Sequence, residues 1–211
     1  MLNLKLKTIA SLVDPQDVVL DTCCDHAYLA IYLKKNHLCK DVYASDINPN
    51  ALEIAKRNIQ DAGESIQTYL SDGFQNIDNE KINTTVIAGV GTSTVLDIIK
   101  QAPKNIKKFL ISSNNHPELL RKTLFQWGLY IQKEMAIYDK HKYYIILLVT
   151  KDLVRENRIS LKYGNSKNRS YYLDLIKKEE EVIQRLPSRN FIEKWRQQKN
   201  KKELQKLIKR I

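Results

Sequence analysis

A regular alternation of two kinds of segment constrains the fold of this 211-residue chain more than any other feature of its sequence. Apolar, β-branched runs indicate strands at 18–22, 41–47, 65–72, 84–90 and 107–113. Amphipathic patterns indicate helices at 27–35, 49–62, 93–102 and 117–128. Strands that alternate with helices are typical of crossover units, so the sequence predicts a parallel sheet.

The two ends of this alternating region carry a different pattern. Residues 4–13 predict a short amphipathic helix ahead of the first strand. Residues 129–150 predict two antiparallel strands around a turn near Asp139 and Lys140. The expected fold class is therefore α/β, with a mostly parallel sheet and an antiparallel edge.

The C-terminal quarter of the chain changes character. Residues 158–170 are polar and predict a linker, whereas 171–186 and 188–211 carry apolar residues at helical spacing. Pro187 separates these two helices, and Ser188 is the expected N-cap of the second. Because the break between them is short, we expect the helices to pack as an antiparallel hairpin.

Net charge is distributed very unevenly along the chain. Residues 151–211 hold 18 Lys and Arg against 8 Asp and Glu, a net charge of +10 out of the total of +11. The first 150 residues are therefore nearly neutral. This asymmetry favours an appended element that binds nucleic acid. The alternative is a Lys-rich helical tail that is merely solvated.

Cysteine usage and hydropathy limit the class of protein. Cys23, Cys24, Asp25, His26 and Cys39 lack the paired spacing of a zinc site, so we expect no metal and no disulfide framework. No run approaches the roughly 18 apolar residues of a transmembrane helix. The N-terminus lacks the apolar core of a signal peptide. We therefore expect a cytoplasmic monomer without a membrane partner.

An acid lies at the carboxyl end of each of the first three predicted strands. Asp21, Asp46 and Asp72 recur 25 and 26 residues apart, and Asp25 lies in the first turn. Acids are poor strand formers, and the carboxyl ends of parallel strands meet at the edge of a sheet where ligands bind. One explanation is that each acid caps the helix that follows it. The register of three acids favours a shared ligand instead.

The positions of these acids indicate which ligand they suit. A carboxylate after the second strand can accept both ribose hydroxyls, and one after the third can accept the adenine amino group. An acid at the first turn suits a cationic centre and repels a pyrophosphate, and the anion-cradling glycines are absent. The pattern argues against NAD, FAD and ATP, and it predicts S-adenosylmethionine.

Five motifs together resemble the TrmK family of bacterial tRNA (adenine(22)-N1)-methyltransferases. They are DxxxDHAYL at 21–29, SDINPNAL at 45–52, SDG at 71–73, IAGVG at 87–91 and the basic helical tail. The resemblance spans the whole chain. It implies a Rossmann-like class I methyltransferase domain that binds S-adenosylmethionine over 1–157. It also implies a basic coiled-coil hairpin that binds tRNA over 158–211.

The resemblance and the strand-end pattern together give a set of site residues. Those expected to bind the cofactor are Asp21, Cys23, Asp46, Ile47, Asp72, Gly73, Gly89 and Val90. Those expected to bind the RNA substrate are Gly91, Asn114, Lys199, Lys201, Lys202 and Lys206. The family usually has a glycine where Cys23 stands and often another where Thr92 stands. Either the first turn needs no positive φ, or the affinity for the cofactor is reduced.

The residues expected in catalysis are Asp25, His26 and Tyr28. The loop after the fourth strand offers no side-chain acceptor for an exocyclic amine, but adenine N1 has its own lone pair and needs none. Asp25 would stabilise the cationic product, and His26 and Tyr28 would orient it or stack on the base. The alternatives are a hydrogen bond at a helix start for His26 and core packing for Tyr28.

Two other functions remain open from the sequence. One is a non-catalytic RNA-binding protein with a degenerate cofactor site, which the cysteine in the first turn suggests. The other is methylation of a different RNA or of a protein. Binding of labelled S-adenosylmethionine separates the first of these from an enzyme.

Overall fold

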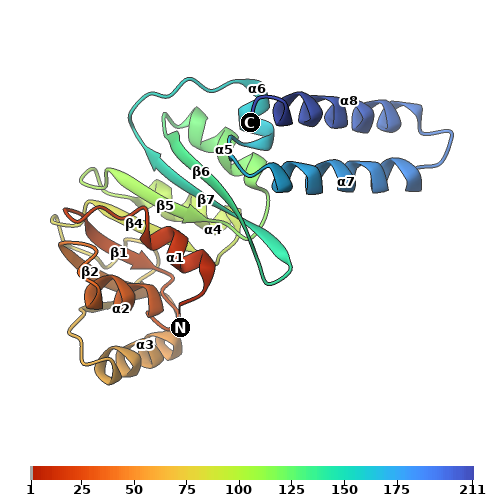
Figure 1. The fold of residues 1–211 in the computed structure, drawn as a ribbon. Helices are drawn as coiled ribbons and strands as arrows, with labels where there is room; N and C mark the ends of the chain where they lie inside the picture. The colour runs from red at the N-terminus through yellow and green to blue at the C-terminus, as the bar shows by residue number, and fades with distance from the viewer. Residues whose placement is uncertain (1) are drawn as a thin grey trace.

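A seven-stranded sheet forms the centre of the protein in a computed structural model that describes residues 2–211 (Figure 1). The strands are β1 (Val18–Thr22), β2 (Asp41–Asp46), β3 (Thr68–Leu70), β4 (Thr84–Ala88), β5 (Lys108–Ser112), β6 (Tyr130–Asp139) and β7 (Lys142–Thr150). Their order across the sheet is β3-β2-β1-β4-β5-β7-β6. β1 to β5 pair in parallel, and β7 pairs antiparallel with β5 and β6. The predicted fold class is confirmed.

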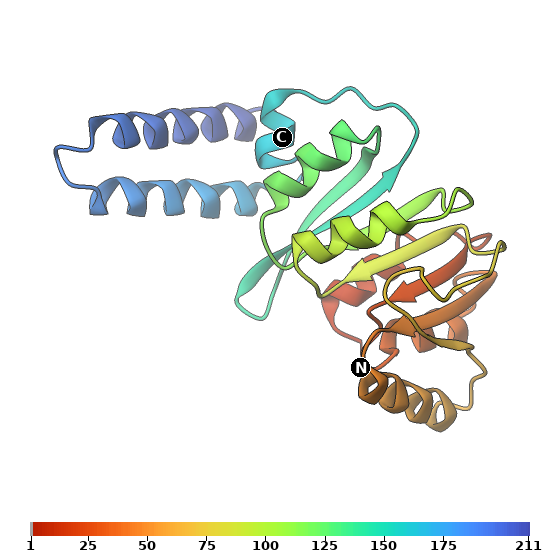
Figure 2. The same cartoon turned by 180° about the vertical axis from the view of Figure 1, so that it is seen from behind.

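Helices cover both faces of this sheet (Figures 1 and 2). They are α1 (Leu4–Ala10), α2 (Tyr28–Lys35), α3 (Pro49–Asp61), α4 (Thr92–Gln101), α5 (Pro117–Gln126), α6 (Arg158–Tyr163), α7 (Arg169–Arg185) and α8 (Phe191–Ile208). Neighbouring strand residues serve opposite faces: Val86 belongs to the buried cluster that includes α1, α2 and α3, whereas Ile87 belongs to the cluster that includes α4 and α5. Both faces of the sheet are therefore buried under helices, which explains the continuous apolar runs in the sequence.

Two predictions about the C-terminal region are wrong. Residues 158–163 form α6 rather than a linker, because Asn157 and Ser160 make a capping box. The Asn157 side chain accepts from the Ser160 amide at 3.0 Å, and the Asn157 amide donates to Ser160 Oγ at 2.9 Å. The N-cap of α8 is Asn190 rather than Ser188. The predicted strand at 65–72 is also shorter, since β3 spans three residues.

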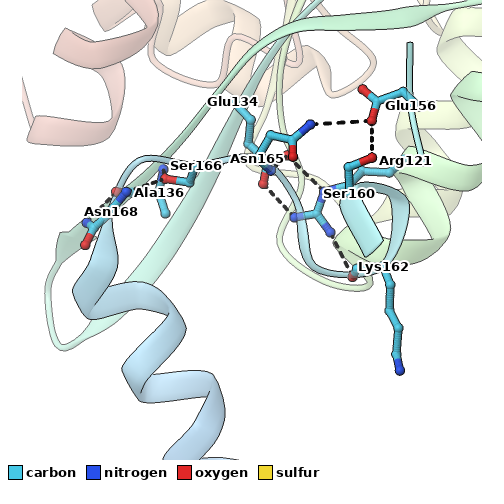
Figure 3. Close-up of polar contacts among 9 residues, drawn as sticks. All are labelled: Arg121, Glu134, Ala136, Glu156, Ser160, Lys162, Asn165, Ser166 and Asn168. Carbon is cyan, nitrogen blue, oxygen red and sulfur yellow. Dashed lines mark hydrogen bonds and ion pairs between the residues drawn. The ribbon is translucent and has the colours of Figure 1, made fainter. Parts of the chain in front are cut away.

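A buried ion pair joins α5 to the edge strand β6. Arg121 Nη2 donates to Glu134 Oε1 at 2.7 Å, and Arg121 Nε donates to Glu134 Oε2 at 3.0 Å. Both side chains are only 1% exposed. Arg121 also donates to the Lys162 carbonyl at 3.3 Å, which ties in the last turn of α6 (Figure 3). Gly164 lies against the pair at φ +87°, where a Cβ would overlap the Glu134 carboxylate.

The segment after α6 attaches the base of the hairpin to β6 (Figure 3). The Ala136 amide donates to Ser166 Oγ at 3.0 Å, and Asn168 Nδ2 donates to the Ala136 carbonyl at 2.8 Å. The Asn168 side chain also accepts from the Tyr171 amide and so caps α7. These two side chains thus satisfy the amide and the carbonyl of Ala136 on the edge strand β6. Without them, these backbone groups would be free to pair with another chain. The helices α7 and α8 then run antiparallel away from the sheet.

We predict that Glu134→Ala lowers the free energy of unfolding by about 3–5 kcal/mol, because it leaves the buried Arg121 guanidinium without its partner. Urea denaturation of the unliganded protein measures this. Asp174→Ala is the matched control, because it removes the exposed pair with Lys178 and should cost less than about 1 kcal/mol. Equal losses in the two variants would contradict the prediction.

Candidate active site at the carboxyl ends of the strands

The turn between β1 and α2 bends through three left-handed residues, none of them glycine. Cys23, Asp25 and Ala27 have φ of 54°, 50° and 56°. Each such residue costs on the order of 1–3 kcal/mol unless its surroundings hold it in place. The Cys24 amide is held by the Ser45 carbonyl at 3.0 Å. Position 23 therefore does adopt a positive φ, although it carries a cysteine rather than a glycine.

Asp46 at the end of β2 connects this turn to the next one. Its Oδ2 accepts from the Asp25 amide at 2.9 Å, and its Oδ1 accepts from the Asn48 amide at 2.9 Å. Each carboxylate oxygen keeps a further lone pair for a ligand. Ile47 follows and is 62% exposed, which is unusual for an apolar side chain beside a buried carboxylate. The structure thus brings Asp25, Asp46 and Ile47 together.

Asp21 lies in β1, just ahead of the turn, and is only 5% exposed. Its pKa is raised to about 7, mainly by burial and in part by the nearby Asp46, whereas a hydrogen bond from the Ala30 amide opposes the rise. Ionised and neutral forms of this carboxyl are therefore both populated near neutral pH. A cationic ligand would favour the ionised form.

The three strand-end acids converge on Cys23. Burial together with the negative charges of Asp46, Asp21 and Asp72 raises the pKa of the Cys23 thiol to about 12. Asp72 is exposed after β3, and Gly73 beside it has φ +60°. This left-handed backbone conformation favours glycine, whereas the nearby Gln101 side chain could move away from an added Cβ. The thiol itself stays neutral and is a packing residue in this turn.

The loops after β4 and β5 form the other side of the site. Gly89 has φ +91°, and a Cβ there would have only Lys5 Nζ, 3.8 Å away, within 4 Å among the described residues. Asn114 Nδ2 donates to the Gly89 carbonyl at 2.6 Å, and the Asn114 amide donates to the Val90 carbonyl at 2.9 Å. Gly91 is the N-cap of α4. Asn114 thus positions the glycine loop.

The predicted catalytic residues lie side by side at the start of α2. His26 Nδ1 is 2.7 Å from Asp25 Oδ1, and the His26 and Tyr28 rings have centroids 5.4 Å apart. Asn58 Nδ2 donates to the His26 carbonyl at 2.9 Å. Tyr28 is 54% exposed, so core packing does not account for it. An exposed acid, a partly buried imidazole and an exposed aromatic ring therefore lie together at the start of α2.

The predicted RNA-binding lysines divide into two kinds. Lys199, Lys202 and Lys206 are exposed on α8 and are spaced three and four residues apart, so they form one stripe along the helix. Trp195 extends this stripe toward the tip of the hairpin, with Lys199 Nζ 5.2 Å from its ring centroid. Lys201 instead pairs with Glu180 of α7 at 2.6 Å. Lys201 therefore joins the two helices of the hairpin.

The donor set around these loops fits an adenosyl ligand with a cationic centre. Buried Asp21 offers a carboxylate that a cation would ionise, Asp46 offers free lone pairs, and Gly89 leaves space at the end of β4. Within residues 2–211, no group of three or more His, Cys, Asp and Glu residues could hold a metal ion. In the same range, no helix is long and apolar enough to cross a membrane.

We predict that Asp21→Asn removes a pH dependence of stability. In the wild type the folded pKa of Asp21, about 7, exceeds the ordinary value of 3.8. Between those values the folded state holds a proton that the unfolded state has lost, so the free energy of unfolding falls as pH rises. From pH 5 to pH 8, the free energy of unfolding of the variant should rise by about 2–3 kcal/mol relative to that of the wild type.

Urea denaturation of unliganded protein at the two pH values measures this gain. Asp78→Asn, at an exposed position outside the site, is the control. Parallel pH profiles for wild type and Asp21→Asn would show that Asp21 titrates at its ordinary value.

Comparison with known proteins agrees with this geometry. Residues 2–147 match a family model described as a methyltransferase domain. MG248 of Mycoplasma genitalium, whose name assigns it provisionally to the tRNA methyltransferases, is 33% identical over 151 residues, which are 70% of this chain and 69% of that protein.

Two solved structures match almost the whole chain. M. capricolum TrmK, solved with S-adenosyl-homocysteine, has a TM-score of 0.86 and 28% identity, and the match covers 99% of this chain and 98% of that one. Streptococcus pneumoniae Sp1610, solved with S-adenosyl-L-methionine, has a TM-score of 0.87 and 22% identity over 99% and 100% of the chains. The chain therefore belongs to the methyltransferase domain family, and within that family it belongs with TrmK.

Proposed function

We propose that this protein transfers a methyl group from S-adenosylmethionine to N1 of adenine 22 in tRNA. The observation that carries the proposal is the placement of Asp21, Asp46 and Asp72 at the carboxyl edge of three neighbouring parallel strands, with Asp46 bonded to the first turn and an open glycine loop after β4. The relatives supply the substrate: MG248 is named for tRNA methylation, and B. subtilis TrmK is described as an m1A22 tRNA methyltransferase.

The strand-end residues would hold the methyl donor, which supplies an electrophilic methyl group on a sulfonium. Asp46 accepts from the ribose hydroxyls, and Asp21 faces the charged methionyl end. Around the adenine lie Ile47, Asp72 and Gly73. Cys23, Gly89 and Val90 line the remaining space. This distribution places negative charge beside a cationic ligand, whereas a pyrophosphate would be repelled.

The chemistry needs little beyond positioning. The N1 lone pair lies in the plane of the base and can attack the methyl group directly, so no general base is required before the attack. Positive charge then develops on the adenine ring. Asp25 lies at the surface of the first turn and stabilises that charge. His26 and Tyr28 orient the base or stack on it, and Gly91 and Asn114 shape the loop that it approaches.

The hairpin would supply the affinity for RNA. Adenine N1 takes part in Watson–Crick pairing, so the target base must be unpaired or extruded before it can enter the site. Lys199, Lys202 and Lys206 line one side of α8, and successive lysines are separated by about 5 Å along the helix axis. Such a stripe contacts phosphates and carries no sequence information, so the choice of adenine rests with the strand-end loops.

Nucleoside mass spectrometry tests the proposal directly. Purified protein is incubated with S-adenosylmethionine and unmodified tRNA, and 1-methyladenosine is expected only when adenine occupies position 22. Methylation of a tRNA with guanine at that position would refute the assigned target. Failure to bind labelled S-adenosylmethionine would favour the non-catalytic alternative.

We predict that Asp25→Asn lowers kcat by about tenfold or more, because the variant keeps the shape of the side chain but loses its charge. Steady-state kinetics at saturating S-adenosylmethionine measure this, and affinity for the cofactor should change much less. Asp61→Asn at the end of α3 is the control. A normal kcat would leave Asp25 with a purely structural role in the turn.

We predict that changing Lys199, Lys202 and Lys206 together to Gln weakens tRNA binding and lowers its salt slope by about two to three, because fewer counterions are released. Binding is measured between 50 and 200 mM salt, about the range over which such contacts are lost. The control replaces Lys81, Lys104 and Lys107, which are exposed at the amino ends of the strands. Equal effects of both sets would mean that net charge, rather than the stripe, governs binding.

A further inference from the structure

Three lysines from distant parts of the sequence gather beside the candidate active site. Lys5 lies on α1, Lys140 lies in the turn between β6 and β7, and Lys142 begins β7. The helix α1 packs against both of these strands (Figure 1). The first 150 residues have a net charge of only +1, so a cluster of three cations is a marked local excess in this domain.

Tyr144 holds two of these lysines in place. Lys142 Nζ is 4.7 Å from the centroid of the Tyr144 ring, and Lys5 Nζ is 5.6 Å from it. Both distances are within the range of cation–π contacts. Lys140 and His141 form a two-residue hairpin turn with φ of 46° and 65°. Such turns have a defined geometry, so Lys140 is also carried on a stiff element.

The charges of the three lysines are poorly compensated. Among residues 2–211, none of the three has a carboxylate oxygen within 4 Å of its Nζ. Burial lowers the pKa of Lys5, and Lys142 and Lys140 lower it further, whereas Asp21 raises it. Asp139 lies opposite Lys142 in the register of β6 and β7, but the two side chains form no ion pair. An anion bound here would relieve this repulsion.

Members of the cluster lie beside the glycine loop and share a hollow with Tyr28, two parts of the expected site for the target base. Lys5 Nζ is 3.8 Å from where a Cβ of Gly89 would stand, at the end of β4. Lys140 and Tyr28 line the same open hollow of about 670 Å³, together with Asn3 and Tyr32. A nucleotide whose base reaches the glycine loop carries its phosphodiester only one sugar away.

We propose that Lys5, Lys140 and Lys142 form a phosphate site that holds a phosphodiester next to the methylated adenosine of the RNA. This inference rests on the proposed function and adds a contact to it. The hairpin stripe would hold the body of the tRNA, whereas this cluster, here called the rim site, would hold the backbone of the target nucleotide. A cation at that point also favours extrusion of the base, because it anchors the backbone about which the nucleotide turns.

The experiment compares wild type with the double variant Lys5→Gln/Lys142→Gln. We expect the KM for tRNA to rise about tenfold and the salt slope of tRNA binding to fall by about one to two. The Kd for S-adenosylmethionine should stay within about twofold of the wild type. Lys81→Gln, at an exposed position ahead of β4, is the matched control.

A chemically neutral linkage then locates the contact. The RNA carries a single methylphosphonate on the 5′ or the 3′ side of the target adenosine. One of these should raise the KM of the wild type about tenfold, and the same linkage should cost the double variant less than about twofold because the contact is already lost. Equal costs in both proteins would refute a direct phosphate site.

Two further outcomes would overturn the inference. If the double variant loses affinity for S-adenosylmethionine but not for RNA, the lysines bind the carboxylate of the methyl donor. If KM and salt slope match the wild type, the cluster is a solvated surface. If wild-type protein binds S-adenosylmethionine but leaves adenine 22 unmethylated, the proposed function is wrong. The rim site is then tested separately by the salt slope of RNA binding, compared between the wild type and the double variant.

Discussion

The buried pair of Arg121 and Glu134 is the interaction on which the arrangement of the two ends of the molecule depends. Removing a guanidinium and a carboxylate from water is costly, and the cost is offset only when geometry and additional hydrogen bonds are good. Here α5, β6, the carbonyl of Lys162 and the Asn165 amide all contribute. Gly164 is required because a side chain would collide with the pair. The hairpin therefore leaves the sheet in one direction rather than many.

That direction matters under the proposed function, in which the hairpin holds the tRNA and the strand-end loops receive one base. The anchoring segment contributes Ser166 and Asn168 to the backbone of Ala136, so the base of the hairpin continues the sheet edge. A hairpin on a loose linker would bind RNA with a spread of orientations, and most of them would leave the target base out of reach. Fixing the hairpin to the catalytic domain reduces this loss.

Much of the fold could be predicted from the sequence because alternating apolar runs and helical patterns are local signals. The shared location of the acids at the ends of β1, β2 and β3 was also predictable, since the carboxyl ends of parallel strands lie at one edge of the sheet. Helix α6 was missed because Asn157 and Ser160 are equally common in loops. The clustering of Lys5, Lys140 and Lys142 was missed because nothing local in the sequence connects Lys5 to Lys142. Their proximity arises only when α1 packs on the β6–β7 hairpin.

The distribution of charge within the site suits two ligands of opposite sign. Asp21 lies buried and has a raised pKa, whereas Lys5 lies above it with a lowered pKa, so each group in the unliganded protein is shifted toward its neutral form. A cationic methyl donor would stabilise the ionised Asp21, and an anionic backbone would stabilise the charged Lys5. The two shifts are opposite in sign but have one common cause, which is burial without a sufficient partner. Under the two proposals, the acid and the base would therefore direct the cofactor and the RNA to different parts of the same site.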